Sequence, residues 1–156
     1  MAFELSDWGA AKILDSRDII SRIDDLESSE TDLTDATEEL AEIEESEPGA
    51  TADRLDAARE LRDTAADDFP AEEREELETL RSIAEQGNYG DWDHGETLIL
   101  DSHFVDYARE FASDIGAISA DAQWPLSHID WDAAADALKA DYTEIEAAGE
   151  SYFMRA

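Results

Sequence analysis

Apolar side chains recur at helical spacing from residue 16 to residue 86. Leucines, isoleucines and alanines three, four or seven positions apart share one face of a helix. This pattern predicts four helices, at about residues 16–26, 34–45, 51–67 and 70–86. We expect the polar run at residues 28–31 to separate the first two helices, and Pro48-Gly49 to end the second. Pro70 suits the first turn of the fourth helix, where a missing amide donor is tolerated.

Strand and helix patterns alternate after a cluster of turn-forming residues at 87–95. The predicted elements are a strand at 96–100, helices at 103–115 and 130–140, and a β-hairpin with strands at 142–146 and 151–155. Gly116 is placed to end the first of these helices and Asp130 to cap the second. Most aromatic residues lie in this half, so we expect the stable core there and a helical arm in front of it.

The expected fold class is α+β, with a mostly helical N-terminal half and a small C-terminal domain of two helices and a short antiparallel sheet. We place the boundary at the turn cluster. An acidic helical region then covers residues 1–90, and a compact α+β domain covers residues 91–156. A chain of 156 residues suits one domain, or one domain with an appendage.

Negative charge dominates the composition. The chain has 43 acidic and 11 basic residues, a formal net charge of -32, whereas a magnitude of roughly 2–8 keeps a small domain in solution. Such a surface repels anionic membranes and nucleic acids. We therefore expect no direct nucleic-acid or membrane contact and a basic protein partner, most commonly a nucleic-acid-binding protein.

The densest acidic stretch runs from Asp24 to Glu47, with twelve acidic residues and no basic one. Acidic side chains three or four positions apart on a helix form a ridge, with a rise of about 4.5–6 Å between them. This spacing is of the order of the ~3.4 Å per phosphate along one DNA strand. We expect the following residues to act as phosphate surrogates: Asp35, Glu38, Glu39, Glu42 and Glu45.

Catalytic and metal-binding patterns are missing from the sequence. The chain has no cysteine, and its three histidines, His94, His103 and His128, lie near acids but without zinc-ligand spacing. There is also no EF-hand, phosphate-binding loop or nucleophile elbow. We expect no catalytic residue, no metal site and no cofactor, and we interpret the histidines as surface or capping residues.

The same sequence predicts a soluble, cytoplasmic protein. Residues 1–10 lack the basic and apolar segments of a signal peptide, and no apolar run approaches the roughly 20 residues that span a bilayer. Two other interpretations of the charge stay open. An acidic run also suits a solvated helix face or a partly disordered linker, and two lysines against nine arginines suit an acidic protein of a halophile. The helical arm could also pair with itself in a homodimer.

Ten residues from Ile129 to Leu138, IDWDAAADAL, resemble the I-D-[YW]-x-A-x-x-x-x-L pattern of the ArdA family of antirestriction proteins. The preceding FVDYAR at 104–109, the IGAI at 115–118 and the closing SYFMR at 151–155 are similar to further parts of that family. The resemblance covers roughly the last 55 residues. It implies a phage or mobile-element protein that imitates DNA and occupies the DNA groove of type I restriction–modification enzymes. It adds these phosphate surrogates: Asp106, Glu110, Asp114, Asp132 and Asp136.

Charge and resemblance together predict a non-enzymatic DNA-mimic inhibitor of a host defence enzyme, acting in the host cytoplasm if a phage encodes it. A type I restriction–modification complex is the expected target. Two alternatives remain. One is an anti-CRISPR inhibitor of a nucleic-acid-binding effector, and the other is a halophilic accessory protein whose acidity serves no mimicry.

Overall fold

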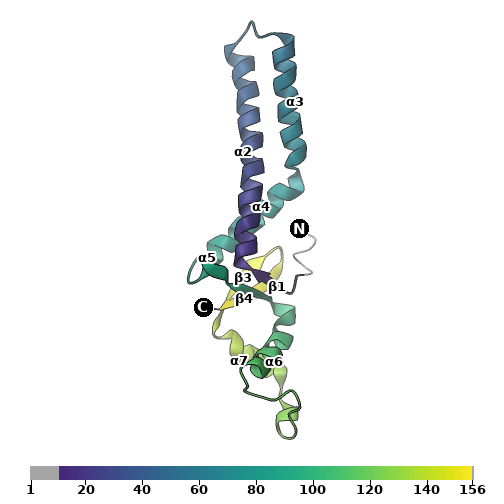
Figure 1. Ribbon diagram of the computed structural model, residues 1–156, viewed down its shortest axis with the longest axis vertical. Coiled ribbons are helices and arrows are strands. Elements are labelled where there is room, and N and C mark those ends of the chain that lie inside the picture. The colour runs from purple at the N-terminus through teal and green to yellow at the C-terminus, as the bar shows by residue number, and fades with distance from the viewer. Residues whose placement is uncertain (1–10, 156) are drawn as a thin grey trace.

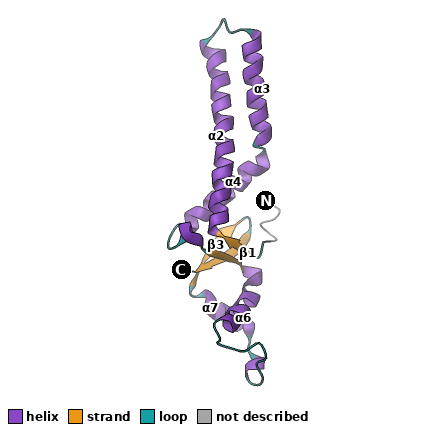
Figure 2. Ribbon diagram, viewed as in Figure 1, coloured by secondary structure: helices purple, strands orange, loops and turns teal. Residues whose placement is uncertain are grey.

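The computed structural model describes residues 11–155 and shows an elongated molecule (Figure 1). A long helical hairpin extends to one side of a small sheet, and two short helices lie on the other side (Figures 1 and 2). The helices are α2 (Ser16–Ser46), α3 (Ala52–Asp68), α4 (Ala71–Gly87), α5 (Trp92–Gly95), α6 (Phe104–Asp114) and α7 (Trp131–Lys139). The strands are β1 (Ile13–Asp15), β2 (Thr97–Leu100), β3 (Tyr142–Ala147) and β4 (Glu150–Arg155). Residues 1–10, where no signal peptide is expected, lie outside the described part.

The predicted α+β fold class is confirmed. The helices predicted at 51–67, 70–86, 103–115 and 130–140 correspond to α3, α4, α6 and α7. The predicted strand corresponds to β2, and the predicted hairpin to β3 and β4. Asp130 caps α7 as expected, because its carboxylate accepts a hydrogen bond from the Ala133 amide at 3.1 Å.

The predicted break at residues 28–31 is wrong, because α2 continues through it as one helix of 31 residues. Leu26 is buried and Leu33 is half-buried, and their spacing of seven positions keeps the apolar face in register across the polar run. The hydroxyl of Thr31 donates a hydrogen bond back to the Glu27 carbonyl and so needs no break in the helix. Polar residues on the exposed face are therefore accommodated within the helix.

The four strands form an antiparallel sheet in the order β1-β2-β4-β3. Successive side chains of a strand point to opposite faces. Leu98 and Leu100 of β2 accordingly join a core with α2 and α4, whereas Ile99 packs with Phe104 of α6 and Ala135 of α7. The sheet is thus the middle of three layers.

The larger core crosses the boundary expected between residues 90 and 91. It combines Ile19, Leu26 and Leu80 from the helical region with Ile145 and Tyr152 of the β-hairpin. Strand β1 also belongs to the helical region by sequence and pairs with β2. The sheet, α2 and α4 therefore share one hydrophobic core.

The outer part of α2 and the antiparallel α3 form the arm that stands away from this core (Figure 1). Leu40 and Ile43 of α2 bury Ala58 of α3 near the tip. At the base of the arm, Arg22 of α2 and Glu76 of α4 form a double hydrogen bond. The arm is therefore continuous with the packed body through α2. None of the described helices is long and apolar enough to cross a membrane.

Candidate acidic interface on the helical arm

One face of the outer part of α2 carries an acidic ridge, which we call the α2 ridge. Its members are all exposed, follow one another at three or four positions, and are Asp35, Glu38, Glu42 and Glu45. They lie on the side of α2 opposite the buried Leu40 and Ile43. At 1.5 Å per residue the ridge extends for about 15 Å. None of its carboxylates forms an ion pair within residues 11–155.

Arginines neutralise other acids of α2 at both ends of this ridge. Towards the body, Arg81 of α4 pairs with Glu27 at 3.0 Å and with Glu30 at 2.7 Å. The hydrogen bond from Arg81 holds the pKa of the Glu30 carboxyl below its usual value. Towards the tip, Arg59 of α3 pairs with Glu44 at 3.2 Å. The negative charge of α2 is therefore uncompensated mainly along the middle of the arm.

The outward face of α3 carries a second acidic row, which we call the α3 stripe. Its members are exposed, lie opposite the buried Ala58, and are Asp53, Asp56, Glu60, Asp63 and Asp67. Two of them contact arginines of the same helix, Asp56 with Arg59 and Asp63 with Arg62. Each row lies on the side of its helix that faces away from the other helix. The arm therefore shows acids on two opposite flanks.

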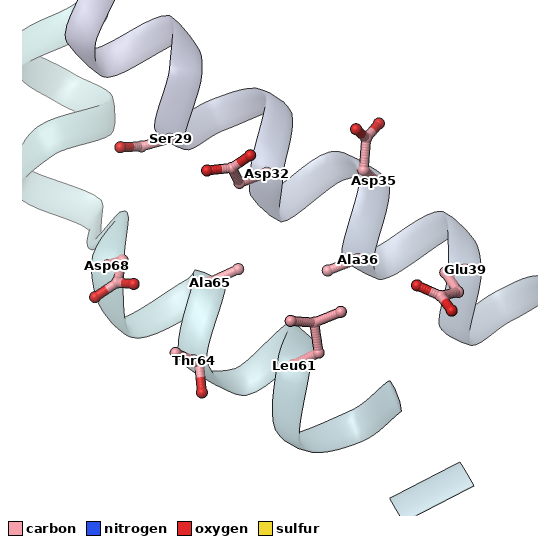
Figure 3. A pocket seen from close by; sticks show the side chains of 9 residues that line it. All are labelled: Ser29, Asp32, Asp35, Ala36, Glu39, Leu61, Thr64, Ala65 and Asp68. Carbon is pink, nitrogen blue, oxygen red and sulfur yellow. The ribbon is translucent and has the colours of Figure 1, made fainter. Parts of the chain in front are cut away.

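Between the two helices lies an open groove with a volume of about 550 Å³ (Figure 3). Ala36 of α2 and Leu61 and Ala65 of α3 supply its apolar surface, and the Leu61 side chain reaches toward Ala36 (Figure 3). Leu61 is 53% exposed although it faces α2. The groove exists because Ala36 and Ala65 are too small to close the space between the helices.

Among residues 11–155 no basic residue lines this groove, whereas four acidic residues do: Asp32, Asp35, Glu39 and Asp68. None of the four forms an ion pair with another described residue. Of the five surrogates predicted on α2, Glu39 belongs to the groove and Asp35 stands at its edge, its carboxylate pointing away from α3 (Figure 3). Asp32, Leu61 and Asp68 were not predicted as site residues, since their role depends on how α3 packs against α2.

The other five predicted surrogates lie at the opposite end of the molecule. Asp106, Glu110 and Asp114 are exposed on α6, and Asp132 and Asp136 are exposed on α7. Figure 1 places both helices across the sheet from the arm. The structure thus separates the ten predicted residues into two groups.

Basic side chains compensate part of the second group. Asp106 lies 4.0 Å from Arg109, and Asp136 lies 3.8 Å from Lys139. The α2 ridge has no such neighbours among the residues that the structure describes. We therefore consider the arm the stronger candidate for attracting a basic partner.

The histidines do not converge on a site. His94 is exposed at the end of α5, His128 is exposed in a short turn, and His103 is half-buried at the start of α6. Within residues 11–155 no cluster of three or more histidine or acidic side chains has the arrangement of a metal site.

No protein-family model, curated protein or solved structure matches this chain. The resemblance to antirestriction proteins therefore rests on the sequence motifs at residues 104–109, 115–118, 129–138 and 151–155.

Proposed function

We propose that this protein is a non-enzymatic inhibitor that presents its acidic arm to the DNA-binding groove of a host defence enzyme. A type I restriction–modification complex is the proposed target. The observation that carries the proposal is the α2 ridge, a row of exposed carboxylates that form no ion pair with residues 11–155, on a helix anchored in the core.

The dimensions of the arm support imitation of a duplex. Packed helices lie about 8–10 Å apart, and outward side chains extend about 5–6 Å from each axis. The α2 ridge and the α3 stripe therefore stand roughly 20 Å apart on opposite flanks. A DNA duplex likewise carries a row of negative charges on each of two antiparallel strands, at a comparable width. A protein surface that binds both phosphate backbones of a duplex would therefore find negative charge on both flanks of the arm.

The rigid helical backbone of the arm also favours binding. The acids sit on helices, so a partner does not have to order a flexible chain before it binds. Attraction between the arm and a basic groove acts over long distances and accelerates encounter, and salt weakens it because exposed charges are screened. Binding should therefore be strong at low ionic strength and fall steeply as salt rises.

Protection of an unmodified phage from restriction tests the proposal in cells. We expect expression of the protein to raise plating on a host with a type I system toward the level of a restriction-deficient host. Neutralising the α2 ridge with D35N, E38Q, E42Q and E45Q should remove most of this protection. The matched control neutralises four exposed acids of α4 that form no ion pair with other described residues, with E72Q, E75Q, E78Q and E85Q.

A parallel plating assay on a host with CRISPR immunity separates the possible targets. Relief of CRISPR interference without relief of restriction would assign the arm to a nucleic-acid-binding CRISPR effector. Relief of neither, by a protein that is expressed and folded, would contradict the inhibitor proposal for both classes of enzyme.

A further inference from the structure

The groove between α2 and α3 combines two features that a DNA duplex does not. It has an apolar floor of Ala36, Leu61 and Ala65, and it is bordered by carboxylates that have no basic partner in the described part of the chain. Its volume of about 550 Å³ lies within the roughly 300–1,000 Å³ range of ligand pockets. Phosphate imitation alone requires neither a concave surface nor an exposed leucine.

The chemistry of the groove matches one side chain in particular. Arginine carries a planar guanidinium that donates to two carboxylate oxygens at once, on an aliphatic stem that packs on apolar surface. Asp32 and Glu39 lie seven positions apart on one face of α2, about 10.5 Å along the axis, and Asp68 lines the groove from α3. Lysine, a compact and strongly hydrated ammonium, gains less from such a site.

We propose that the groove is a docking site for an arginine-rich segment of the protein partner. This inference rests on the proposed function and deepens it, because it assigns the partner's recognition to arginine side chains on an apolar floor. Half-exposed Leu61 becomes covered in the complex, and Asp32, Glu39 and Asp68 receive the guanidinium groups. The apolar contact adds a component of affinity that salt does not screen.

Two peptides of equal charge test the inference, nona-arginine and nona-lysine, each carrying a fluorescent label. Affinities are measured by anisotropy at about physiological ionic strength, where more distant exposed charges are screened beyond about 8 Å. We expect the wild-type protein to bind nona-arginine several-fold more tightly than nona-lysine. The groove variant D32N/E39Q/D68N should weaken nona-arginine binding about tenfold, as expected for three lost surface pairs, and should reduce the preference for arginine.

Leu61→Ser provides a test that changes no charge. Because Leu61 is exposed, its replacement leaves the core intact, yet it removes apolar floor and should also lower the preference for arginine. The control E72Q/E75Q/E78Q removes three charges from α4 and should weaken both peptides equally and slightly.

The outcomes distinguish this inference from the proposed function. If the groove variants keep the arginine preference of the control, the groove inference is overturned, whereas the inhibitor proposal still depends on the α2 ridge. If the groove variants lose the preference while E38Q/E42Q/E45Q weakens neither peptide, the groove inference is supported and the ridge is contradicted as a binding surface.

Discussion

Removal of the Glu76 carboxylate tests how the arm is anchored to the body. The Glu76 side chain is 3% exposed, and the Arg22 side chain that it binds is 16% exposed. Arg22 donates two hydrogen bonds to Glu76, at 2.9 and 2.8 Å. Glu76→Ala would leave a largely buried guanidinium that keeps the Glu73 carboxylate, 3.8 Å away, and a weaker attraction from Asp25.

The expected cost follows from these contacts. Hydrogen bonds to charged groups contribute about 1.5–3 kcal/mol each, and removal of one partner of a buried ion pair costs about 3–5 kcal/mol. Since Glu73 retains part of the attraction, we expect Glu76→Ala to lower the free energy of unfolding by about 3 kcal/mol. In a chain of this size this loss corresponds to a fall in Tm of roughly 6–12 °C.

Urea denaturation followed by circular dichroism measures this change. Glu75→Ala is the matched control, because Glu75 is the exposed neighbour on α4 and its side chain forms no ion pair within residues 11–155. The control should change the free energy of unfolding by less than about 0.5 kcal/mol. The double variant R22M/E76L replaces the pair with apolar side chains and should recover most of the loss. Equal stability of Glu76→Ala and Glu75→Ala would refute the anchoring role of the pair.

Three further predictions concern the body and the charge. Burial raises the pKa of the Tyr142 hydroxyl, and contact with Tyr107 at 3.0 Å adds to this effect. The folded state therefore keeps the Tyr142 proton at a pH near 10, where the unfolded chain releases it. The contribution of this group to stability is full below about pH 10 and is lost as the pH rises further. A rise in the phenolate absorbance of Tyr142 without unfolding would contradict this prediction. Gly87→Ala should cost about 1–3 kcal/mol in thermal unfolding, because its Cβ would lie 2.6 Å from a ring carbon of buried Trp92, whereas Gly49→Ala meets nothing. The wild-type protein should show its helical circular dichroism in dilute buffer, whereas folding only in molar salt would favour the halophilic interpretation.

Local patterns were sufficient to predict most elements of the fold. The β-hairpin follows from alternating side chains on either side of Ala148-Gly149, and both turn residues have positive φ, as a type I′ hairpin turn requires. Strand β1 has three residues and no visible alternation, and it forms because β2 offers it a partner. The spacing of Leu26 and Leu33 indicates one continuous helix α2, and the polar residues between them do not interrupt it.

The candidate interface was predictable only in part. Exposure of the acidic ridge follows from its position opposite the apolar face of α2, which the sequence reveals. Neutralisation of Glu27 and Glu30 does not follow, because Arg81 is more than fifty residues away in the chain. The groove likewise requires α3 to place Leu61 opposite Ala36. Tertiary packing thus decides which carboxylates remain available to a partner.

The most direct test of the central claim is competition for a DNA-binding site. A labelled duplex that contains the recognition sequence is bound to a purified type I methyltransferase at low salt, and its anisotropy is followed as the protein is added. We predict that the protein displaces the duplex, and that D35N/E38Q/E42Q/E45Q requires about tenfold more protein, within the range expected for the loss of four surface contacts. If the folded protein leaves the duplex bound, or if the ridge variant displaces it equally well, the arm does not act as a DNA mimic on this enzyme.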